Sequence, residues 1–118
     1  MEIVEFTAAD ECIVSGDRNR VDSANLNQIS GPAFTILDSD GVPIACGGLR
    51  VSGTAEAWFQ MNKVAEKQHL KTVMRQCKKR LEEMQRDEKI YQMYARCDIS
   101  ENFLEHLGFK KVNDIFVR

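Results

Sequence analysis

Residues 56–112 read EAWFQMNKVAEKQHLKTVMRQCKKRLEEMQRDEKIYQMYARCDISENFLEHLGFKKV, and the order of elements in this stretch decides the fold. Residues 56–61 are aromatic and alternating, which is typical of a strand. The next segment has apolar residues at helical spacing, which predicts one long amphipathic helix over about residues 66–86. Its apolar stripe consists of Leu70, Val73, Met74, Cys77, Leu81 and Met84. A second aromatic strand over residues 90–95 and a short helix that stops at Gly108 complete the stretch.

The segment before this stretch predicts an antiparallel meander. Residues 32–37 and 42–51 have strand character, and the four residues between them, DSDG, are typical of a hairpin turn. A short turn then leads into the strand over residues 56–61, so three consecutive strands are expected to pair. Gly47 and Gly48, inside the second strand, indicate a bulge or the close approach of another backbone.

The two ends of the chain add further elements. Residues 3–6 alternate weakly and are expected to form an edge strand, and residues 112–117 are expected to form a last strand. Residues 15–30 are polar, and we expect a loop there with one helical turn at most. The predicted fold is therefore α+β: a single domain over residues 1–118 with a mixed, mostly antiparallel central sheet flanked by helices.

Length and composition exclude several classes of protein. A chain of 118 residues has room for one domain, and it contains no apolar run of about 20 residues that would cross a membrane. The amino terminus has no basic segment typical of a signal peptide, so we expect a cytoplasmic protein. The four cysteines, Cys12, Cys46, Cys77 and Cys97, form no C-x-x-C pair, which favours free thiols over a disulfide or zinc site. The histidines lack a ligand pattern, so no metal site is predicted.

Charge is distributed unevenly along the chain. Residues 1–61 hold 9 acidic and 3 basic residues, whereas residues 62–89 hold 9 basic and 5 acidic residues. A basic segment within a protein of net charge −2 indicates a local anion site rather than a nucleic-acid-binding surface. The aromatic residues also lack an RNA-stacking motif, so no nucleic acid partner is predicted.

The order strand, long helix, strand, short helix, with Leu107-Gly108-Phe109 at its end, resembles the acyl-CoA-binding half of the GNAT superfamily of N-acyltransferases. The resemblance covers about residues 32–117. It implies a GNAT-like fold, acetyl-CoA or CoA as cofactor, and transfer of the acyl group to an amine of a protein or small molecule. In that superfamily the strand before the long helix contacts the pantetheine, which here implies Phe59, Gln60 and Met61.

The phosphate-binding loop of the superfamily corresponds here to residues 62–69. The loop usually has a Q/R-x-x-G-x-G/A pattern, but this segment contains no glycine. Without glycine the backbone does not easily adopt the positive-φ turns that direct several N–H groups at one phosphate. Lys63, Lys67 and Lys71 can supply positive charge instead. The alternative is that these lysines form only the solvated face of an amphipathic helix.

Candidate catalytic groups are few. Counting back from Gly108, the position of the superfamily's tyrosine acid holds Leu104, which cannot protonate a thiolate. Cys97, at a strand end, is a candidate relay or proton donor, or else a small core residue. Glu56 is the candidate base, or else a solvent-facing strand residue. His106 is a second candidate base, expected at the surface.

Within the superfamily, the chain most resembles small GNAT-like proteins of tailed phages, including a podophage internal virion protein group. The likeness is carried by residues 43–48, by residues 57–59, by the basic helix and by residues 103–108. It implies an alternative function as a non-catalytic interaction or virion protein with a host or virion partner, located in the host cytoplasm or the virion. An exposed edge strand can pair with a second copy, so a monomer or a homodimer is expected.

Overall fold

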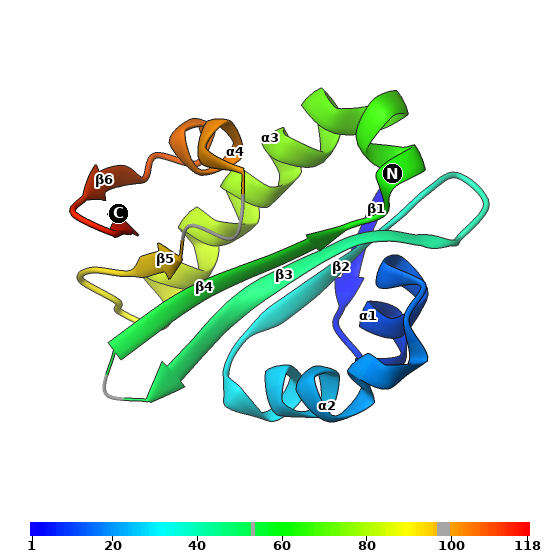
Figure 1. The fold of residues 1–118 in the computed structure, drawn as a ribbon, viewed down its shortest axis with the longest axis horizontal. Helices are drawn as coiled ribbons and strands as arrows, with labels where there is room; N and C mark the ends of the chain where they lie inside the picture. Colours follow the sequence, from blue (N-terminus) through cyan, green and yellow to red (C-terminus); the bar gives the residue numbers. More distant parts are fainter. Residues whose placement is uncertain (53, 97–99) are drawn as a thin grey trace.

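The computed structural model describes residues 1–52, 54–96 and 100–118, and seven strands within them form one sheet. The strands are β1 (Glu2–Glu5), β2 (Ala33–Leu37), β3 (Pro43–Ser52), β4 (Thr54–Met61), β5 (Tyr94–Arg96), β6 (Lys110–Val112) and β7 (Ile115–Val117). Their order across the sheet is β1-β2-β3-β4-β5-β7-β6 (Figure 1). Every neighbouring pair is antiparallel except β4 and β5, which are parallel. The predicted α+β class, with a mixed and mostly antiparallel sheet, is confirmed.

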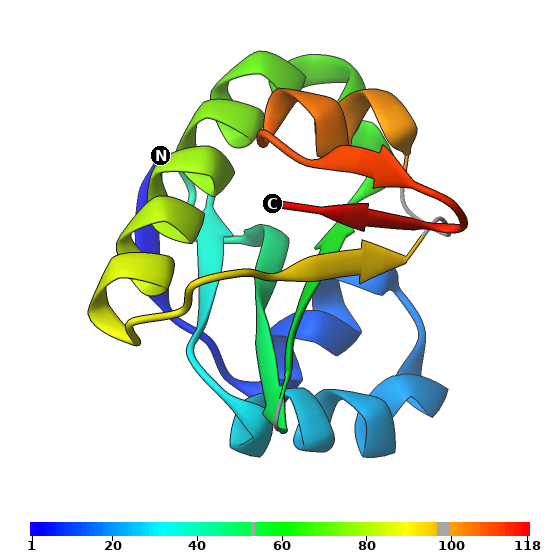
Figure 2. The ribbon, with the colours of Figure 1, turned by 90° about the vertical axis from the view of Figure 1, so that its left-hand side faces the viewer.

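Helices cover both faces of the sheet (Figures 1 and 2). They are α1 (Ala8–Ser15), the 3-10 turn η1 (Arg18–Arg20), α2 (Val21–Ser30), α3 (Lys63–Asp87) and α4 (Glu101–His106). The helices α1 and α2 pack on one face, and α3 and α4 on the other. No helix in the described residues is both long and apolar enough to span a bilayer.

The predicted apolar stripe of the long helix forms most of its contact with the sheet. Val73, Cys77, Leu81 and Met84 are buried in the larger hydrophobic cluster, together with Phe34, Ile36 and Leu49 of the sheet. Full burial of an aliphatic side chain of this size contributes roughly 1.5–3 kcal/mol. Leu70 and Met74, at the amino-terminal end of the stripe, are only partly covered. The helix is therefore less covered at Leu70 and Met74 than further along its length, and both residues line the candidate site.

The polar segment over residues 15–30 is helical, so the expected loop is wrong. Asp17 caps η1 by accepting a hydrogen bond from the Asn19 amide (2.9 Å). In α2 the buried positions are Ala24 and Asn27, whereas the apolar Leu26 is 53% exposed. A helix held to the sheet by a buried asparagine has no apolar periodicity, and this is why the hydrophobic pattern did not reveal it.

Two predicted strands also differ from the expectation. The strand predicted over residues 90–95 is shorter, because Lys89 adopts a φ of 54° and β5 begins only at Tyr94. The last strand predicted over residues 112–117 is a hairpin of β6 and β7, turned at Asn113, which also has a positive φ. Both are local turns at non-glycine residues, which a strand pattern does not anticipate.

The segment expected as a phosphate loop, residues 62–69, is mostly helical. Asn62 starts α3 by accepting hydrogen bonds from the amides of Val64 (2.9 Å) and Ala65 (3.3 Å). The backbone of His69 is non-helical (φ −131°, ψ 16°), which kinks the helix before Leu70. The predicted long helix over residues 66–86 is confirmed, and the structure extends it by a short helical segment in front of this kink.

The glycine pair of β3 marks a close backbone approach. The register between β3 and β4 runs without interruption through Gly47 and Gly48, so no bulge lies there. A Cβ atom on Gly48 would lie 2.6 Å from the carbonyl oxygen of Pro32 and 2.7 Å from Cβ of Ala33. Of the two readings of the pair, the close approach is therefore the one that the structure shows.

We predict that Gly48→Ala lowers the free energy of unfolding by about 1–3 kcal/mol, since an added methyl group in a filled space forces backbone shifts. Urea denaturation followed by circular dichroism measures this difference. Ser52→Ala, at an exposed position of the same strand, is the matched control and should change stability by less than about 0.5 kcal/mol. Equal stability of the two variants would contradict the close approach.

Candidate functional site

The parallel strands β4 and β5 separate almost as soon as they meet. Within the described residues they share one register pair, Glu56↔Tyr94, and the two strands then run apart (Figure 2). The Asn62 amide donates to Ile44 of β3 (2.8 Å), so alternation along β4 directs the backbone groups of Phe59 and Met61 away from β3. These groups point into the gap, on the side where β5 no longer runs alongside.

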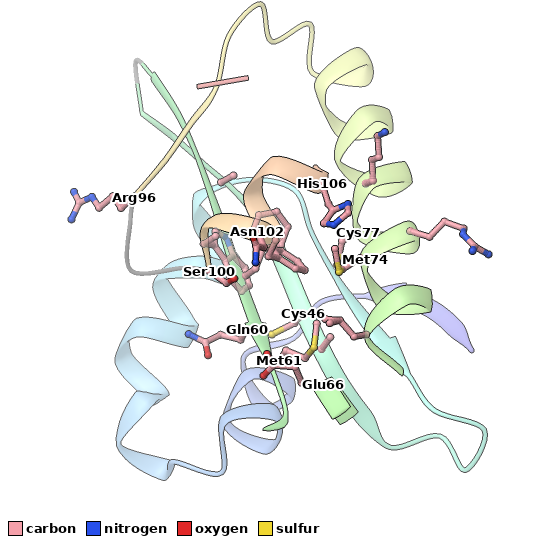
Figure 3. A pocket seen from close by; sticks show the side chains of 18 of the residues that line it. Cys46, Gln60, Met61, Glu66, Met74, Cys77, Arg96, Ser100, Asn102 and His106 are labelled. Atoms are coloured by element: carbon pink, nitrogen blue, oxygen red, sulfur yellow. The ribbon is translucent and has the colours of Figure 1, made fainter. Parts of the chain in front are cut away.

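A cleft of about 1040 Å3 opens at this separation (Figure 3). This volume is at the upper end of the usual range for small-molecule and cofactor sites. The sheet contributes Ala45, Cys46, Arg50, Glu56, Ala57, Trp58, Phe59, Gln60, Met61 and Arg96 to its lining. The helix α3 contributes Glu66, Leu70, Lys71, Met74, Arg75, Cys77 and Lys78, and the α4 region contributes Ser100, Asn102, Phe103 and His106. Arg20 and Asn27 lie at the end of the cleft near α2.

Strand β4 divides the lining between the two faces of the sheet. Side chains alternate along a strand, so Glu56, Trp58 and Gln60 share one face, and Phe59 and Met61 share the other. Trp58 packs edge-on against Phe6 in the smaller cluster beneath α1, with ring centroids 5.1 Å apart. Phe59 packs edge-on against Phe103 of α4, with centroids 5.2 Å apart. The cleft thus connects the α1/α2 face with the α3/α4 face.

The α3 wall carries a basic stripe, which we define as Lys71, Arg75 and Lys78. These residues follow one another at i, i+4 and i+7, so their side chains lie on one face of the helix and line the cleft. Lys63 and Lys67 are exposed and are not among the lining residues. The kink at His69 separates them from the basic stripe.

A chain of polar contacts, which we call the arginine network, connects α1 and α2 with the cleft. Glu11 is completely buried; it accepts from Asn27 Nδ2 (2.6 Å) and pairs with Arg20 Nε (3.3 Å). Asn27 Oδ1 in turn accepts from Arg50 Nε (2.6 Å). Arg50 Nη1 then donates to Glu56 Oε1 (2.9 Å), so the contacts continue from α1 to β4.

The network ends in the cleft at Glu56. Arg96 Nε lies 2.9 Å from Glu56 Oε2, but Oε2 accepts no well-directed hydrogen bond from any described residue. This contact is therefore an ion pair without hydrogen-bond geometry. Glu56 is only 8% exposed, so its interpretation as a solvent-facing strand residue is wrong.

The structure brings together most of the residues that the sequence suggested. Five of the eight line the cleft: Glu56, Phe59, Gln60, Met61 and Lys71. Lys63 and Lys67 lie outside it, and Cys97 lies outside the described residues. His106 is exposed, as expected, and also lines the cleft.

Sequence reasoning missed the arginines of this site. Arg50 lies directly opposite Glu56 in the β3–β4 register, and counting along the two strands from the Ser52↔Thr54 pair would have paired them. Arg75 and Lys78 were visible only as part of the basic helix face. Arg96 has no local signal, because it reaches Glu56 through the parallel pairing of strands distant in sequence.

Two thiols near the cleft are buried and protonated at neutral pH. Burial raises the pKa of Cys77 from its ordinary value of 9.0 to about 12. Burial, assisted by the negative charges of Glu11 and Asp10, raises the pKa of Cys46 well above its ordinary range. Neither thiol is therefore a ready nucleophile. Among the described residues no group of three or more His, Cys, Asp or Glu side chains is placed to hold a metal ion.

Known structures with the same arrangement include several acetyltransferases. A mutant of the spermidine N-acetyltransferase of Vibrio cholerae superposes with a TM-score of 0.70 at 11% identity, covering 99% of this chain and 92% of that one. The ribosomal-protein-S5-alanine acetyltransferase of Vibrio fischeri gives 0.68 at 12% identity, covering 98% and 91%. A GNAT-family acetyltransferase of Bacillus anthracis gives 0.67 at 10% identity, covering 98% and 92%.

This chain has the GNAT fold. The likeness spans nearly the whole of both chains. The sequence itself has diverged far from these proteins: no family model matches it, and no curated protein does. At identities of 9–14% the comparison shows the GNAT fold and leaves the chemistry to be argued from the cleft.

The buried thiol gives a pH-dependent prediction. Since the pKa of Cys77 is raised in the folded state, its stabilising contribution is complete below pH 9 and is lost as the pH rises towards 12. The stability advantage of the native chain over Cys77→Ala should therefore shrink above pH 9 by about 1.4 kcal/mol per pH unit. Urea unfolding between pH 7 and pH 10.5 measures it. Val73→Ala, a buried neighbour on the same helix, is the control, because its stability difference should not change with pH. A stability difference between the native chain and Cys77→Ala that stays constant from pH 7 to pH 10.5 would contradict the prediction.

Proposed function

We propose that the cleft binds an acyl-CoA, in the simplest case acetyl-CoA, and that the protein transfers the acyl group to a primary amine. The observation that carries this proposal is the separation of β4 from β5. The backbone groups of Phe59 and Met61 point into the cleft where no neighbouring strand of the described chain pairs with them. An extended chain with two amide groups, such as pantetheine, can hydrogen-bond there as a strand would.

The basic stripe supports the same ligand. One helical turn rises 5.4 Å, so Lys71, Arg75 and Lys78 distribute three positive charges over about 10 Å of the cleft wall. The phosphates of CoA are spread over a comparable length. We propose that Lys71 and Arg75 contact the pyrophosphate, with Phe59, Gln60 and Met61 along the pantetheine. Lys63 and Lys67, beyond the kink, contribute at most long-range attraction.

The departure from the superfamily's glycine-rich loop has a structural consequence. The helix α3 begins at Lys63, and the Asn62 side chain already accepts from two of its first amides. The carboxylate of Glu66 also lines the cleft and repels phosphate. Side-chain cations therefore have to replace a backbone nest, and we expect weaker and more salt-dependent cofactor binding.

The transfer requires an oxyanion donor and a base. We propose that an amide N–H of β4, from Phe59 or Met61, stabilises the thioester oxygen while the acceptor amine attacks the carbonyl carbon. A C–N bond forms, the C–S bond breaks, and the amine proton passes to Glu56. Leu104 is buried in the core, so the leaving thiolate takes its proton from solvent or from His106, which lines the cleft.

One observation favours a second function. The segment that carries the phosphate loop in GNAT enzymes is helical here and presents Glu66 to the cleft. A GNAT scaffold that has lost its cofactor would show both features and would act through protein contacts instead. The comparisons give no support to a phage or virion assignment, so this alternative depends on the cleft only.

We predict that acetyl-CoA binds with micromolar to sub-millimolar affinity and that Lys71→Glu/Arg75→Glu weakens it by about ten-fold or more, because two attractive charges become repulsive. Calorimetry at low and at physiological salt measures both values. Lys63→Glu/Lys67→Glu is the matched control: it makes the same charge change on the same helix, outside the cleft. A larger effect from the control pair would place the phosphates in front of the kink, and no binding to the unaltered chain would favour the non-catalytic function.

The proposed base gives a kinetic prediction. Glu56→Gln should lower kcat by roughly 10²–10⁴-fold while the Kd for acetyl-CoA stays within about two-fold, since its side chain lies on the α1/α2 face of the sheet and the basic stripe lies on the other. A coupled thiol-release assay with a panel of amines measures the rate. His106→Ala is the comparison variant. A loss of kcat in that variant alone would indicate that His106, and not Glu56, is the base.

A further inference from the structure

The α1/α2 side of the cleft has more hydrogen-bond donors than acceptors. Arg20, Arg50 and Arg96 line it, and two carboxylates pair with them: Glu56, which also lines the cleft, and Glu11, which is buried behind it. Each guanidinium has five N–H donors. Arg20 and Arg96 each direct Nε at a carboxylate, and Arg50 uses Nε and Nη1. Among the described residues the remaining guanidinium N–H groups have no protein acceptor, so this wall has many unused donors. Three guanidiniums against two carboxylates also leave it with an excess of one positive charge.

A second observation on the same wall is independent of the arginines. The indole Nε1 of Trp58 is buried and has no hydrogen-bond acceptor among the described residues. Trp58 is 94% buried, shares the face of Glu56 and lines the cleft. A buried N–H without a partner costs about 1–3 kcal/mol, and such a group is usually satisfied by water or a ligand. The indole of Trp58 is therefore a further hydrogen-bond donor on a residue of this wall, in addition to the arginines.

We propose that the amine acceptor carries an anionic group, a carboxylate or a phosphate, and that Arg50 and Arg96 bind this group. The proposal rests on the proposed N-acyltransferase function and adds the substrate class. Both arginines already lie 2.9 Å from Glu56, one at each oxygen. A substrate whose anionic group binds the two arginines and whose ammonium group binds Glu56 therefore needs only a few bonds between the two groups. Amino acids and short phosphorylated amines have this spacing.

The same wall disfavours a polyamine. A second ammonium group would meet three guanidiniums, of which only two are balanced by the carboxylates of Glu11 and Glu56. Like-charge contacts of this kind discriminate between ligands through repulsion. Arg96 has a side chain that is 72% exposed, so it can move to meet an incoming anion without disturbing the core. Arg50 is half-buried and held by Asn27, so it provides the fixed half of the site.

The experiment uses four short primary amines that differ in their second group. Phosphoethanolamine carries a phosphate, β-alanine a carboxylate, ethanolamine a neutral hydroxyl, and 1,3-diaminopropane a second cation. Each is titrated into the full chain, with and without CoA, by NMR, which detects weak binding. We expect the two anionic amines to bind about ten-fold tighter than ethanolamine, and 1,3-diaminopropane to bind weakest. Binding of only one anionic amine also supports the proposal and separates phosphate from carboxylate.

Variants test the assigned residues. Arg96→Ala should weaken the binding of the anionic amines by about five-fold or more and change the affinity for ethanolamine by less than about two-fold. Arg50→Lys keeps the positive charge but loses the planar, two-pronged donor geometry of the guanidinium, so it should weaken binding of the anionic amines as well. Arg86→Ala, on an exposed arginine outside the cleft, is the control and should change nothing. Because Arg96 is exposed, its variant is expected to fold even if the Arg50 variant does not.

The outcomes separate this inference from the proposed function. Equal affinity for all four amines, tighter binding of 1,3-diaminopropane, or an Arg96→Ala variant that binds like the control would overturn the anionic acceptor, whether or not CoA binds. The CoA titration decides the cofactor independently. Selective binding of the anionic amines without any CoA binding would support the anion site and contradict the proposed acyltransferase function.

Discussion

The end of the pairing between β4 and β5 is the constraint on which the site depends. Backbone N–H and C=O groups inside a protein need partners, and a central strand normally finds them on both sides. Here the backbone groups of Phe59 and Met61 point away from β3, and β5 pairs with β4 only at Tyr94 and then runs apart, so no strand of the described chain pairs with them. On the α3/α4 face of the sheet, Phe103 of α4 packs edge-on against Phe59 and forms part of the cleft wall beside this opening.

The arginine network shows how this opening is held in place from the other face. A buried carboxylate is costly unless it is paired, and Glu11 meets that requirement with Asn27 and Arg20. The same Asn27 holds Arg50, which holds Glu56. Helix α2 therefore contributes to the fold mainly through polar contacts, while its Leu26 and Ile29 stay exposed. The contacts that attach the helix also fix the charges in the cleft.

The sequence predicted the elements whose stability comes from regular burial. The stripe from Val73 to Met84 and the meander of β2, β3 and β4 were readable because helical and strand periods repeat over many residues. It did not predict α2, which depends on Asn27, nor the turns at Lys89 and Asn113, which depend on single backbone conformations. Phe59, Gln60 and Met61, which it suggested as cofactor contacts, line the cleft, because their position follows from the strand–helix order.

The arginines could not be predicted in the same way, since a charged residue has no period and its partner is set by topology. Arg50 and Arg96 flank Glu56 only because β3 and β5 flank β4, one of them across a parallel crossover. This placement has a consequence for both faces of the cleft. Positive charge is in excess on the α3 wall and again on the α1/α2 wall, with uncharged Phe59 and Met61 between them. The proposed ligands match this distribution, with the CoA phosphates at one end, the reacting thioester near the middle and the anionic amine at the other end. The distribution of charge therefore constrains cofactor and acceptor together.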